Sequence, residues 1–526
     1  MQKEDLRKVF NQPYNRASWL KTIENTFKNV SIFSSPKALG APNEKIESFA
    51  QLGTIRLNDG KILALFEVTL ADNVNLVKNR VELRNIVNKY IDQEQAHGVL
   101  SIYEQGGDDY RFTFAAKSTK YNEEGGEFVN KETDKKRYTY VLGKNESCKT
   151  AAERFYNLGQ NKENTTIKEV QDAFNVDKLS KQFFTDYNTH YEKLVNFLIN
   201  PANSFRAWIF KGDEKHIRDF VKILMGRLVF IQFIQKKGWL GVNKDSKSWK
   251  NGESDFLYRA FKKFEHKDQF HSQFLYPLFF EALNQSGRPN DIFELTQSKV
   301  PYLNGGLFEN EEPNTRNVDF PKTYFEALLE FFDQYNFTID ENDPEEREVG
   351  IDPEMLGHIF ENLLEDNKDK GAFYTPKEIV HYMCQESLKE YLKTYLKQNS
   401  NWPIDTEQAT NLEENLHLFV SKKQGAGIIE FEEPLAKALK DVKICDPAIG
   451  SGAFPMGLLN EIFQCVYVLY GPGNDSVKEV WGMEEWQPNV VKLNIIQNSI
   501  YGVDIEKGAV DIARLRFWLS LIVTGT

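Results

Sequence analysis

The stretch from Val442 to Phe454, VKICDPAIGSGAF, decides the fold of the C-terminal third of the chain. Its apolar start predicts a buried strand that ends in Asp446, and a tight loop with Gly450 and Gly452 leads into a helix that begins at Ala453. A glycine loop at the end of a first parallel strand lets a ligand approach the backbone closely. The stretch therefore predicts an α/β fold with a ligand site at the strand end.

Asp446 indicates the charge of that ligand. A lone Gly-x-Gly is shared by many α/β folds, and a dinucleotide would bring a pyrophosphate into the same crevice, where a carboxylate opposes it. S-adenosylmethionine (SAM) presents an ammonium and a sulfonium group, and both are cationic. The acid at this position therefore favours SAM over a dinucleotide.

A second strand is expected at the start of IYGVDIEKGAVDIARLRFWLSL, Ile500 to Leu521. This strand ends in Asp504, and a helix follows it. A carboxylate at the tip of the second strand commonly accepts both ribose hydroxyls. The gap from Gly452 to Asp504 exceeds the roughly 20 residues of a simple βαβ unit. We therefore predict an insertion between the two strands.

The segment GAFYTPKEIVHYM, Gly371 to Met383, predicts the start of another helix. Thr375 is expected to cap it, Pro376 fits its first turn, and Glu378 completes a Thr-x-x-Glu capping box. A helix start of purely structural value accounts for these residues on their own. The functional alternative is that the helix N-terminus and the preceding aromatic residues face a ligand carboxylate.

These motifs together resemble a known family. FYTP, then DPAIGSGAF, then YGVDI followed by ARLRFWLSL, resemble the amino-methyltransferases that act on adenine in DNA. The resemblance is strongest to the large fused type IIG restriction–modification enzymes and more distant to type I modification subunits. Phrases such as GRLVFIQFIQKKGWL and VPYLNGGLFE extend it upstream, so that it spans roughly Asp177 to the end of the chain.

The resemblance implies SAM as the cofactor, double-stranded DNA as the partner, and a set of binding residues. Three positions of the family contact SAM, four form its glycine loop, and two hold the ribose and the adenine ring. In this sequence the three groups are Tyr374, Thr375 and Pro376; Asp446, Ala448, Gly450 and Gly452; and Asp504 and Ile505.

The sequence departs from the family at its catalytic element, Asn-Pro-Pro-Tyr or Asp-Pro-Pro-Tyr, because it contains no Pro-Pro. In the family this element binds the target amine and stacks on a flipped-out base. We expect it, the acid that reads the adenine of SAM and the target-recognition domain beyond residue 526. The chain is therefore expected to be a fragment that does not methylate DNA alone. The alternative is a non-catalytic DNA-binding or assembly subunit that retains a SAM fold.

The first 160 residues are expected to form an α/β domain. QLGTIRL and KILALFEVTL are β-rich runs joined by Asn58-Asp59-Gly60, a strong hairpin signal. A helical pattern over 74–91 follows, and GVLSIYEQ and YRFTFAAK predict two more strands. The charged stretch from Tyr121 to Lys136 is expected to be an exposed loop.

The resemblance to fused enzymes implies a nuclease in this first domain, with an acid on one strand and Glu-x-Lys on the next binding magnesium. Glu67 stands where that pair would fall, and Asp59 is the nearest preceding acid. Thr69 replaces the lysine, however, and Asp59 suits a turn for local reasons. Asp59 and Glu67 are therefore candidates for a magnesium-dependent endonuclease, and a structural or DNA-clamping domain is the alternative.

The predicted fold class is thus α/β and α, in three domains. An N-terminal α/β nuclease-like domain spans 1–160, and a helical connector domain spans 161–340. The N-terminal half of a SAM-dependent methyltransferase domain with a Rossmann-like fold spans 341–526. The acidic, proline-containing run from Thr338 to Glu354 is expected to be a linker.

Composition limits the class of protein. The net charge of −12 argues against a surface that binds nucleic acid everywhere. The stretch from Lys211 to Lys250 is rich in Lys and Arg, which favours a solvated helix face over a phosphate-binding surface. No apolar run is long enough to span a membrane, and the N-terminus does not have the pattern of a signal peptide. Four scattered cysteines indicate the reducing cytoplasm.

Overall fold

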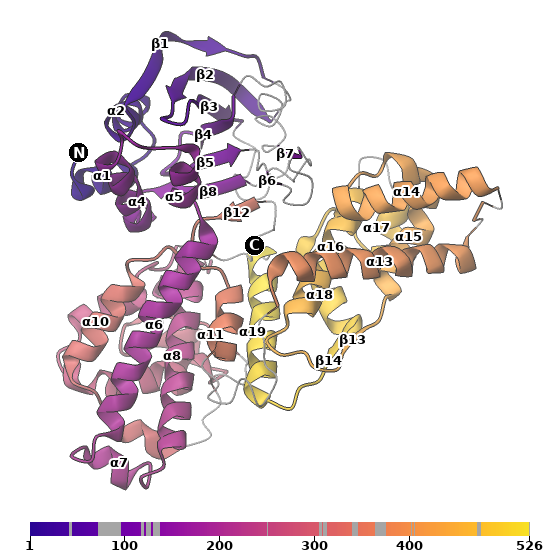
Figure 1. Cartoon of the computed structure of the whole chain (residues 1–526). Coiled ribbons are helices and arrows are strands. Elements are labelled where there is room, and N and C mark those ends of the chain that lie inside the picture. Colours follow the sequence, from indigo (N-terminus) through magenta and orange to yellow (C-terminus); the bar gives the residue numbers. More distant parts are fainter. Residues whose placement is uncertain are drawn as a thin grey trace.

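The computed structural model of the chain describes residues 1–41, 45–71, 96–116, 120–121, 128–129, 137–249, 251–303, 308, 313–338, 346–362, 375–400, 402–403, 405–470 and 475–524. Figure 1 shows a sheet with helices at the N-terminal end, a group of helices next to it, and a second α/β region to the side. We call these the N-terminal region (1–174), the helical region (175–362, without its one strand in the N-terminal sheet) and the C-terminal region (375–524).

The N-terminal region is built on a mixed sheet that has seven strands among the described residues, in the order β1-β2-β3-β4-β5-β8-β12. β3 and β4 are parallel, as are β8 and β12, and the other neighbours are antiparallel. Leu65 and Ile102 face a core shared with the helices, whereas Phe66 and Tyr103 lie in a separate cluster. The elements are α1 (Lys3–Phe10), α2 (Arg16–Thr26), β1 (Asn29–Ala38), β2 (Ile46–Arg56), β3 (Ile62–Leu70), β4 (Gly98–Glu104), β5 (Asp109–Ala116), β8 (Arg137–Gly143), α4 (Lys149–Gln160), α5 (Ile167–Ala173) and β12 (Glu346–Glu348).

The hairpin predicted at Asn58-Asp59-Gly60 is confirmed. It joins β2 and β3, and Gly60 has the positive φ of 78° that the turn requires. The strands predicted in GVLSIYEQ and YRFTFAAK are confirmed as β4 and β5. The helix predicted over 74–91 lies outside the described residues. Within Tyr121 to Lys136 the structure describes only parts of the short strands β6 (Lys120–Tyr121) and β7 (Phe128–Val129).

The predicted linker from Thr338 to Glu354 is corrected by β12, which forms the seventh strand of the N-terminal sheet beside β8. The Val349 N–H also donates to the Thr139 carbonyl at 2.7 Å, and Val349 and Ile351 are fully buried. A three-residue strand is too short to produce a detectable alternation of apolar residues. The acidic residues around β12 therefore led to the prediction of a linker where the structure has a strand.

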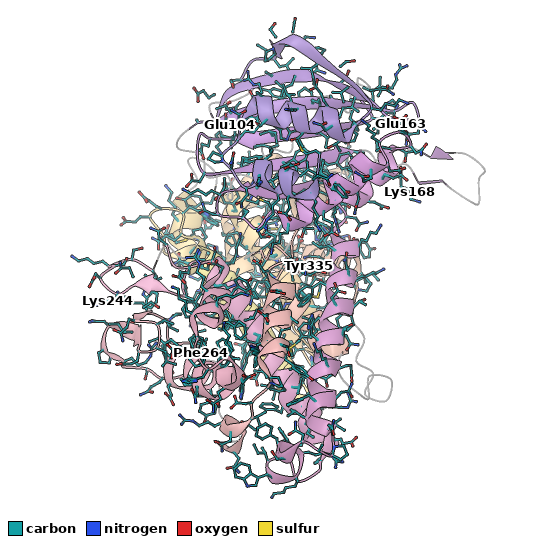
Figure 2. The ribbon with its side chains drawn as sticks, turned by 90° about the vertical axis from the view of Figure 1, so that its left-hand side faces the viewer. Glu104, Glu163, Lys168, Lys244, Phe264 and Tyr335 are labelled. Atoms are coloured by element: carbon teal, nitrogen blue, oxygen red, sulfur yellow. The ribbon has the colours of Figure 1, made fainter. Side chains whose placement is uncertain are left out.

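The helical region agrees with the predicted helical pattern. Its aromatic residues form part of the core: Phe183 packs on Phe331 and Tyr335 with ring centroids 5.1 and 5.0 Å apart. Figure 2 shows Tyr335 close to the boundary with the N-terminal region. The elements are α6 (Val176–Ile199), α7 (Ser204–Trp208), α8 (Glu214–Lys236), β9 (Val242–Asn243), α9 (Phe256–Lys263), η1 (Lys267–Gln269), η2 (His271–Leu275), η3 (Pro277–Leu283), η4 (Pro289–Asp291), β10 (Ile292–Phe293), β11 (Ser298–Lys299), η6 (Pro313–Asn317), α10 (Lys322–Phe332) and α11 (Glu354–Asn362).

The basic stretch from Lys211 to Lys250 does not form one continuous face. Lys222 is buried in α8, and Lys236 is paired with the buried Glu146. Lys244, by contrast, is exposed and lies at the outer edge of the helical region (Figure 2). No helix in the described ranges is long and apolar enough to cross a membrane.

The C-terminal region packs its helices around a parallel pair of strands, β13 and β14. α19 belongs to two cores: Leu515 and Leu519 face the helical region, whereas Ala513 and Phe517 face the C-terminal region. Figure 1 shows α19 standing between these regions. The elements are α13 (Lys377–Asn399), α14 (Thr406–Lys422), η7 (Ala426–Phe431), α15 (Glu432–Asp441), β13 (Ile444–Asp446), α16 (Ala453–Leu469), α17 (Asp475–Trp481), α18 (Pro488–Asn498), β14 (Ile500–Gly502) and α19 (Lys507–Thr524).

The strand pattern of this region differs from the prediction in two details. The residues before Asp446 are partly exposed, with Cys445 open to solvent, because β14 is the only described strand that pairs with β13. β14 ends at Gly502, two residues before Asp504. The predicted insertion between the strands contains the helices α17 and α18.

Candidate functional site

The two strand-end acids lie at one edge of the parallel pair. Asp446 is in register with Gly502, and Asp504 follows two residues later. Beyond the strands the chains stay hydrogen-bonded: the Val503 N–H donates to the Asp446 carbonyl at 3.0 Å, and the Ile449 N–H donates to the Val503 carbonyl at 2.9 Å. Parallel pairing therefore brings Asp446 and Asp504 together, as the predicted site requires.

Both carboxylates bind backbone amides of the loops. Asp504 accepts hydrogen bonds from the Gly450 N–H at 2.8 Å and from the Glu506 N–H at 2.9 Å. Asp446 accepts one from the Ala448 N–H at 3.1 Å. Within the described part of the chain, neither carboxylate forms an ion pair with Lys, Arg or His. Since an ionised carboxylate has about four acceptor positions, both keep the capacity to bind a cationic or hydroxyl-bearing ligand.

The glycine loop needs its glycines. Gly450 and Gly452 have φ angles of 53° and 86°, which L side chains rarely adopt. A Cβ atom on Gly452 would also lie 3.0 Å from the Cβ of Ala513 in α19. The helix that follows β14 therefore presses directly on the loop that follows β13.

A buried arginine of α19 holds the same loop through a hydrogen bond to its backbone. The Arg516 guanidinium in α19 donates from Nη1 to the Ser451 carbonyl at 2.9 Å, and both residues are buried. A Cβ on Gly357 of α11 would collide with the Ser451 hydroxyl and come within 3.3 Å of Arg516 Nη1. The resemblance assigned no function to Arg516 or Gly357, although ARLRFWLSL was part of the matching sequence.

The open side of the loop is apolar. Ile505 is 89% exposed and Val503 is 63% exposed, although both follow a strand of the C-terminal region. Ala448 is also exposed. Exposed aliphatic side chains beside two carboxylates suit a ligand that combines an aromatic ring with polar groups.

The start of α13 lies against α16, the helix that follows the glycine loop. The Cys384 thiol donates to the Phe454 carbonyl at 3.5 Å, and a Cβ on Gly457 would lie 2.8 Å from Val380. Thr375 and Pro376 immediately precede α13 on this side of the region. Tyr374, the third predicted SAM contact of this segment, lies outside the described residues.

The predicted capping box at Thr375 is wrong. The N-cap of α13 is Pro376, and no side chain caps the helix. The Glu378 carboxylate instead accepts a hydrogen bond from Arg347 at 2.7 Å. A buried arginine is a stronger partner for a carboxylate than a backbone amide at a solvent-exposed helix end.

A third acid of this region, Glu461, was not predicted. It is the one acid in α16 and is 3% exposed, and it binds His381 Nδ1 at 2.8 Å and Lys423 Nζ at 2.6 Å. Burial alone would raise its pKa, but the hydrogen bond from His381 and the charge of Lys423 lower the pKa below its ordinary value. A lone acid in an apolar helix was the available signal, and its partners hold α13 and α14 against α16.

The structure does not bring Asp59 and Glu67 together. Asp59 is in the turn that precedes β3, whereas Glu67 lies five residues beyond the first residue of β3, roughly 17 Å along the strand. Asp59 Oδ2 accepts from the Ile167 N–H at 3.3 Å, at the start of α5. Glu67 is buried and binds Tyr14 at 2.6 Å and Arg16 Nε at 2.8 Å. Each acid therefore has a partner that stabilises the fold.

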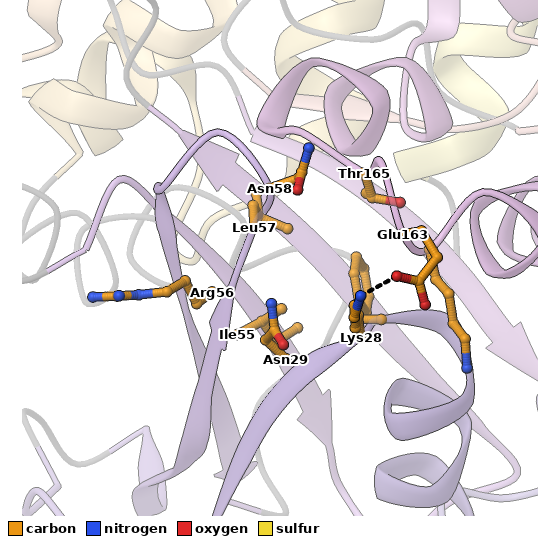
Figure 3. Close-up of a pocket in the computed structure, with 10 residues that line it drawn as sticks. Lys28, Asn29, Ile55, Arg56, Leu57, Asn58, Glu163 and Thr165 are labelled. Atoms are coloured by element: carbon orange, nitrogen blue, oxygen red, sulfur yellow. Dashed lines mark hydrogen bonds and ion pairs between the residues drawn. The ribbon is translucent and has the colours of Figure 1, made fainter.

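A pocket in the N-terminal region is too small for a cofactor. Figure 3 shows it between Asn29, Asn58 and Thr165, with the ion pair of Lys28 and Glu163 at its side. It encloses about 10 Å³, which is room for about one water molecule. Among the described residues no group of acids, histidines and cysteines has the arrangement of a metal site.

The parallel pair of β13 and β14, with Asp446 at the end of β13, Asp504 two residues beyond β14 and a glycine turn leading into α16, defines an α/β protein. In α/β proteins the carboxyl edge of the strands is the usual ligand site. The chain is 31% identical over 374 residues to a protein of Methanocaldococcus jannaschii described as a type II restriction enzyme and methyltransferase. This match takes in 68% of the chain and 28% of the relative's length. The predicted resemblance to restriction–modification enzymes that include a methyltransferase is thereby confirmed.

Comparisons with solved structures and with family models add no further support for the assignment. The type IIL restriction–modification enzyme MmeI, solved in complex with DNA, aligns with a TM-score of 0.37 and 17% identity over 64% of this chain and 36% of its own. No family model matches the chain.

Proposed function

We propose that the strand-end site binds SAM, and that the chain is the cofactor-binding part of an adenine-N6 DNA methyltransferase of a restriction–modification or phage-defence system. The observation that carries the proposal is the pair of carboxylates, Asp446 and Asp504, which meet backbone amides and leave their charge for a ligand. The sequence match to a restriction enzyme and methyltransferase supports the same reaction class.

Each residue has a role that follows from its chemistry. Asp446 attracts the ammonium and sulfonium groups of SAM, while Gly450 and Gly452 let the ligand approach the backbone. Asp504 accepts the ribose hydroxyls, and the exposed Ile505 covers a face of the adenine ring. The helix N-terminus after Thr375 and Pro376, with Tyr374 before them and Ala448 in the loop, suits the methionine carboxylate. When bound, SAM supplies a methyl group attached to a positive sulfur.

We propose that the residues that transfer this methyl group lie elsewhere in the full-length protein. The sequence contains no Pro-Pro, and the chain spans 28% of the length of its relative. The chain by itself is then expected to bind SAM without methylating DNA, as a fragment of a type IIG enzyme.

Nucleoside mass spectrometry tests the reaction. DNA incubated with SAM and the full-length gene product should contain N6-methyladenine. Methylated cytosine alone would contradict the adenine assignment. No modified base, from a protein that still binds S-adenosylhomocysteine by calorimetry, would instead identify a non-catalytic subunit with a retained SAM fold.

DNA cleavage by the N-terminal region is a second candidate, because the relative is described as a restriction enzyme and Glu67 is a buried acid on a central strand. A magnesium ion could reach Glu67 only if Arg16 moved away. Magnesium-dependent cleavage of DNA that Glu67→Gln abolishes would support this candidate. Cleavage that is unchanged by Glu67→Gln would exclude Glu67 from the reaction.

A further inference from the structure

Arg347 lies where the N-terminal, helical and C-terminal regions meet. Its strand, β12, is the edge strand of the N-terminal sheet beside β8. Its side chain is 5% exposed, and its guanidinium donates to Asp177 at 2.6 Å and to Glu378 at 2.7 Å. Asp177 is in the first turn of α6, and Glu378 is in the first turn of α13. One side chain therefore connects all three regions.

The two carboxylates keep this buried arginine charged. Burial opposes the charge of Arg347, but Asp177 and Glu378 outweigh that effect and raise its pKa. A guanidinium can bind two carboxylates through separate N–H groups, whereas an ammonium group cannot reproduce that planar geometry. The connection therefore depends on arginine and on both acids.

The connection ends next to the proposed SAM contacts. Glu378 follows the N-cap Pro376 by two residues and Thr375 by three. Its neighbour Lys377 binds Glu354 at 3.0 Å, at the start of α11. The first turn of α13 is thus held from two sides by the segment that carries β12.

We propose that Arg347 is a positioning residue for the methyl-donor site, which makes the first turn of α13 and the edge of the N-terminal sheet respond to ligand as one unit. This inference rests on the proposed binding of SAM. A ligand that orders the start of α13 stabilises Glu378, then Arg347, then the pairing of β12 with β8. By thermodynamic linkage, order in that strand pair favours the ligand to the same extent.

Hydrogen exchange of the full chain, with and without S-adenosylhomocysteine, tests the inference. In the unmodified protein the ligand should slow exchange in the glycine loop, in residues 377–380 and in β8 and β12. In Glu378→Gln, which changes a half-exposed side chain, the ligand should still protect the loop but no longer β8 and β12. Its dissociation constant should rise about three- to tenfold.

Two variants make the test specific. Arg347→Lys should give an intermediate effect, because lysine retains the charge without the double contact. Asp255→Asn removes an exposed partner of Arg259 elsewhere in the helical region and should change nothing. The inference is overturned if β8 and β12 do not respond to ligand, or if they respond equally in Glu378→Gln. Absence of protection in the glycine loop would overturn the proposed function as well.

Discussion

Glu67 in the N-terminal region and Asp504 in the C-terminal region are both acids of a parallel strand pair, one within β3 and the other two residues beyond β14, yet their surroundings differ. Glu67 is buried and bound by Tyr14 and the guanidinium of Arg16. Asp504 is partly exposed and bound by the backbone amides of Gly450 and Glu506. The charge of Glu67 is paired with an arginine within the protein, whereas Asp504 has only backbone amide partners among the described residues, as our proposal of a ligand site requires. The partners of an acid, more than its place on a strand, therefore separate a structural carboxylate from a binding one.

The largest effect is expected when the ion pair of Arg16 and Glu67 is broken. Arg16→Leu leaves the Glu67 carboxylate buried without its cation, and should destabilise β3 and β4 by about 3 kcal/mol. Native-state hydrogen exchange of these strands measures the loss. Arg56→Leu on β2 is the matched control, because Arg56 is exposed, and it should cost less than about 0.5 kcal/mol. Equal effects of the two variants would mean that the pair contributes nothing.

A smaller effect is expected in the loop that the carboxylates hold. Gly452→Ala and Gly482→Ala both place a side chain at positive φ, which costs about 1–2 kcal/mol, but only the first brings a Cβ to 3.0 Å from Ala513. Gly452→Ala should therefore lower the stability more and weaken S-adenosylhomocysteine binding, whereas Gly482→Ala leaves binding unchanged. Thermal unfolding and calorimetry measure the two effects. Identical binding by both variants would contradict the role of the loop.

The smallest expected effect concerns Glu461, a buried carboxylate of the C-terminal region that is paired with His381 and Lys423. Its pKa lies below the ordinary value of 4.5 in the folded protein. The stability that it contributes is thus fully present above pH 4.5 and is lost as the pH falls through the folded pKa. Glu461→Gln should flatten the dependence of stability on pH below 4.5. An unchanged acid limb of the unfolding curve would show that the lowered pKa has no consequence.

The sequence predicted best where local chemistry determines structure. The hairpin at Gly60 and the helix from Ala453 follow from turn residues and apolar periodicity. The strand-end acids were also predicted, because parallel strands must end at one edge. The contacts that no local pattern encodes were missed: Arg16 with Glu67 across 51 residues, and Arg347 with Glu378 across 31.

The errors share one cause. The capping box at Thr375 was predicted from local sequence, but Glu378 binds a buried arginine from another region and does not cap the helix. Similarly, the acidic run before Glu354 looked like a linker until β12 paired with β8. Tertiary partners overrode local preference in both places, and both places lie at the meeting point of the three regions.

Calorimetric titration of the chain with SAM, before and after Asp504→Asn, tests the central claim most directly. Asparagine keeps one of the two acceptor oxygens that bind the Gly450 and Glu506 amides, so the substitution should lower the melting temperature by only about 5 °C and leave the protein folded. It should weaken SAM binding about 100-fold, since two charge-assisted hydrogen bonds at about 1.5 kcal/mol each are lost. Unchanged affinity for SAM, or loss of folding with Asp504→Asn, would contradict the account.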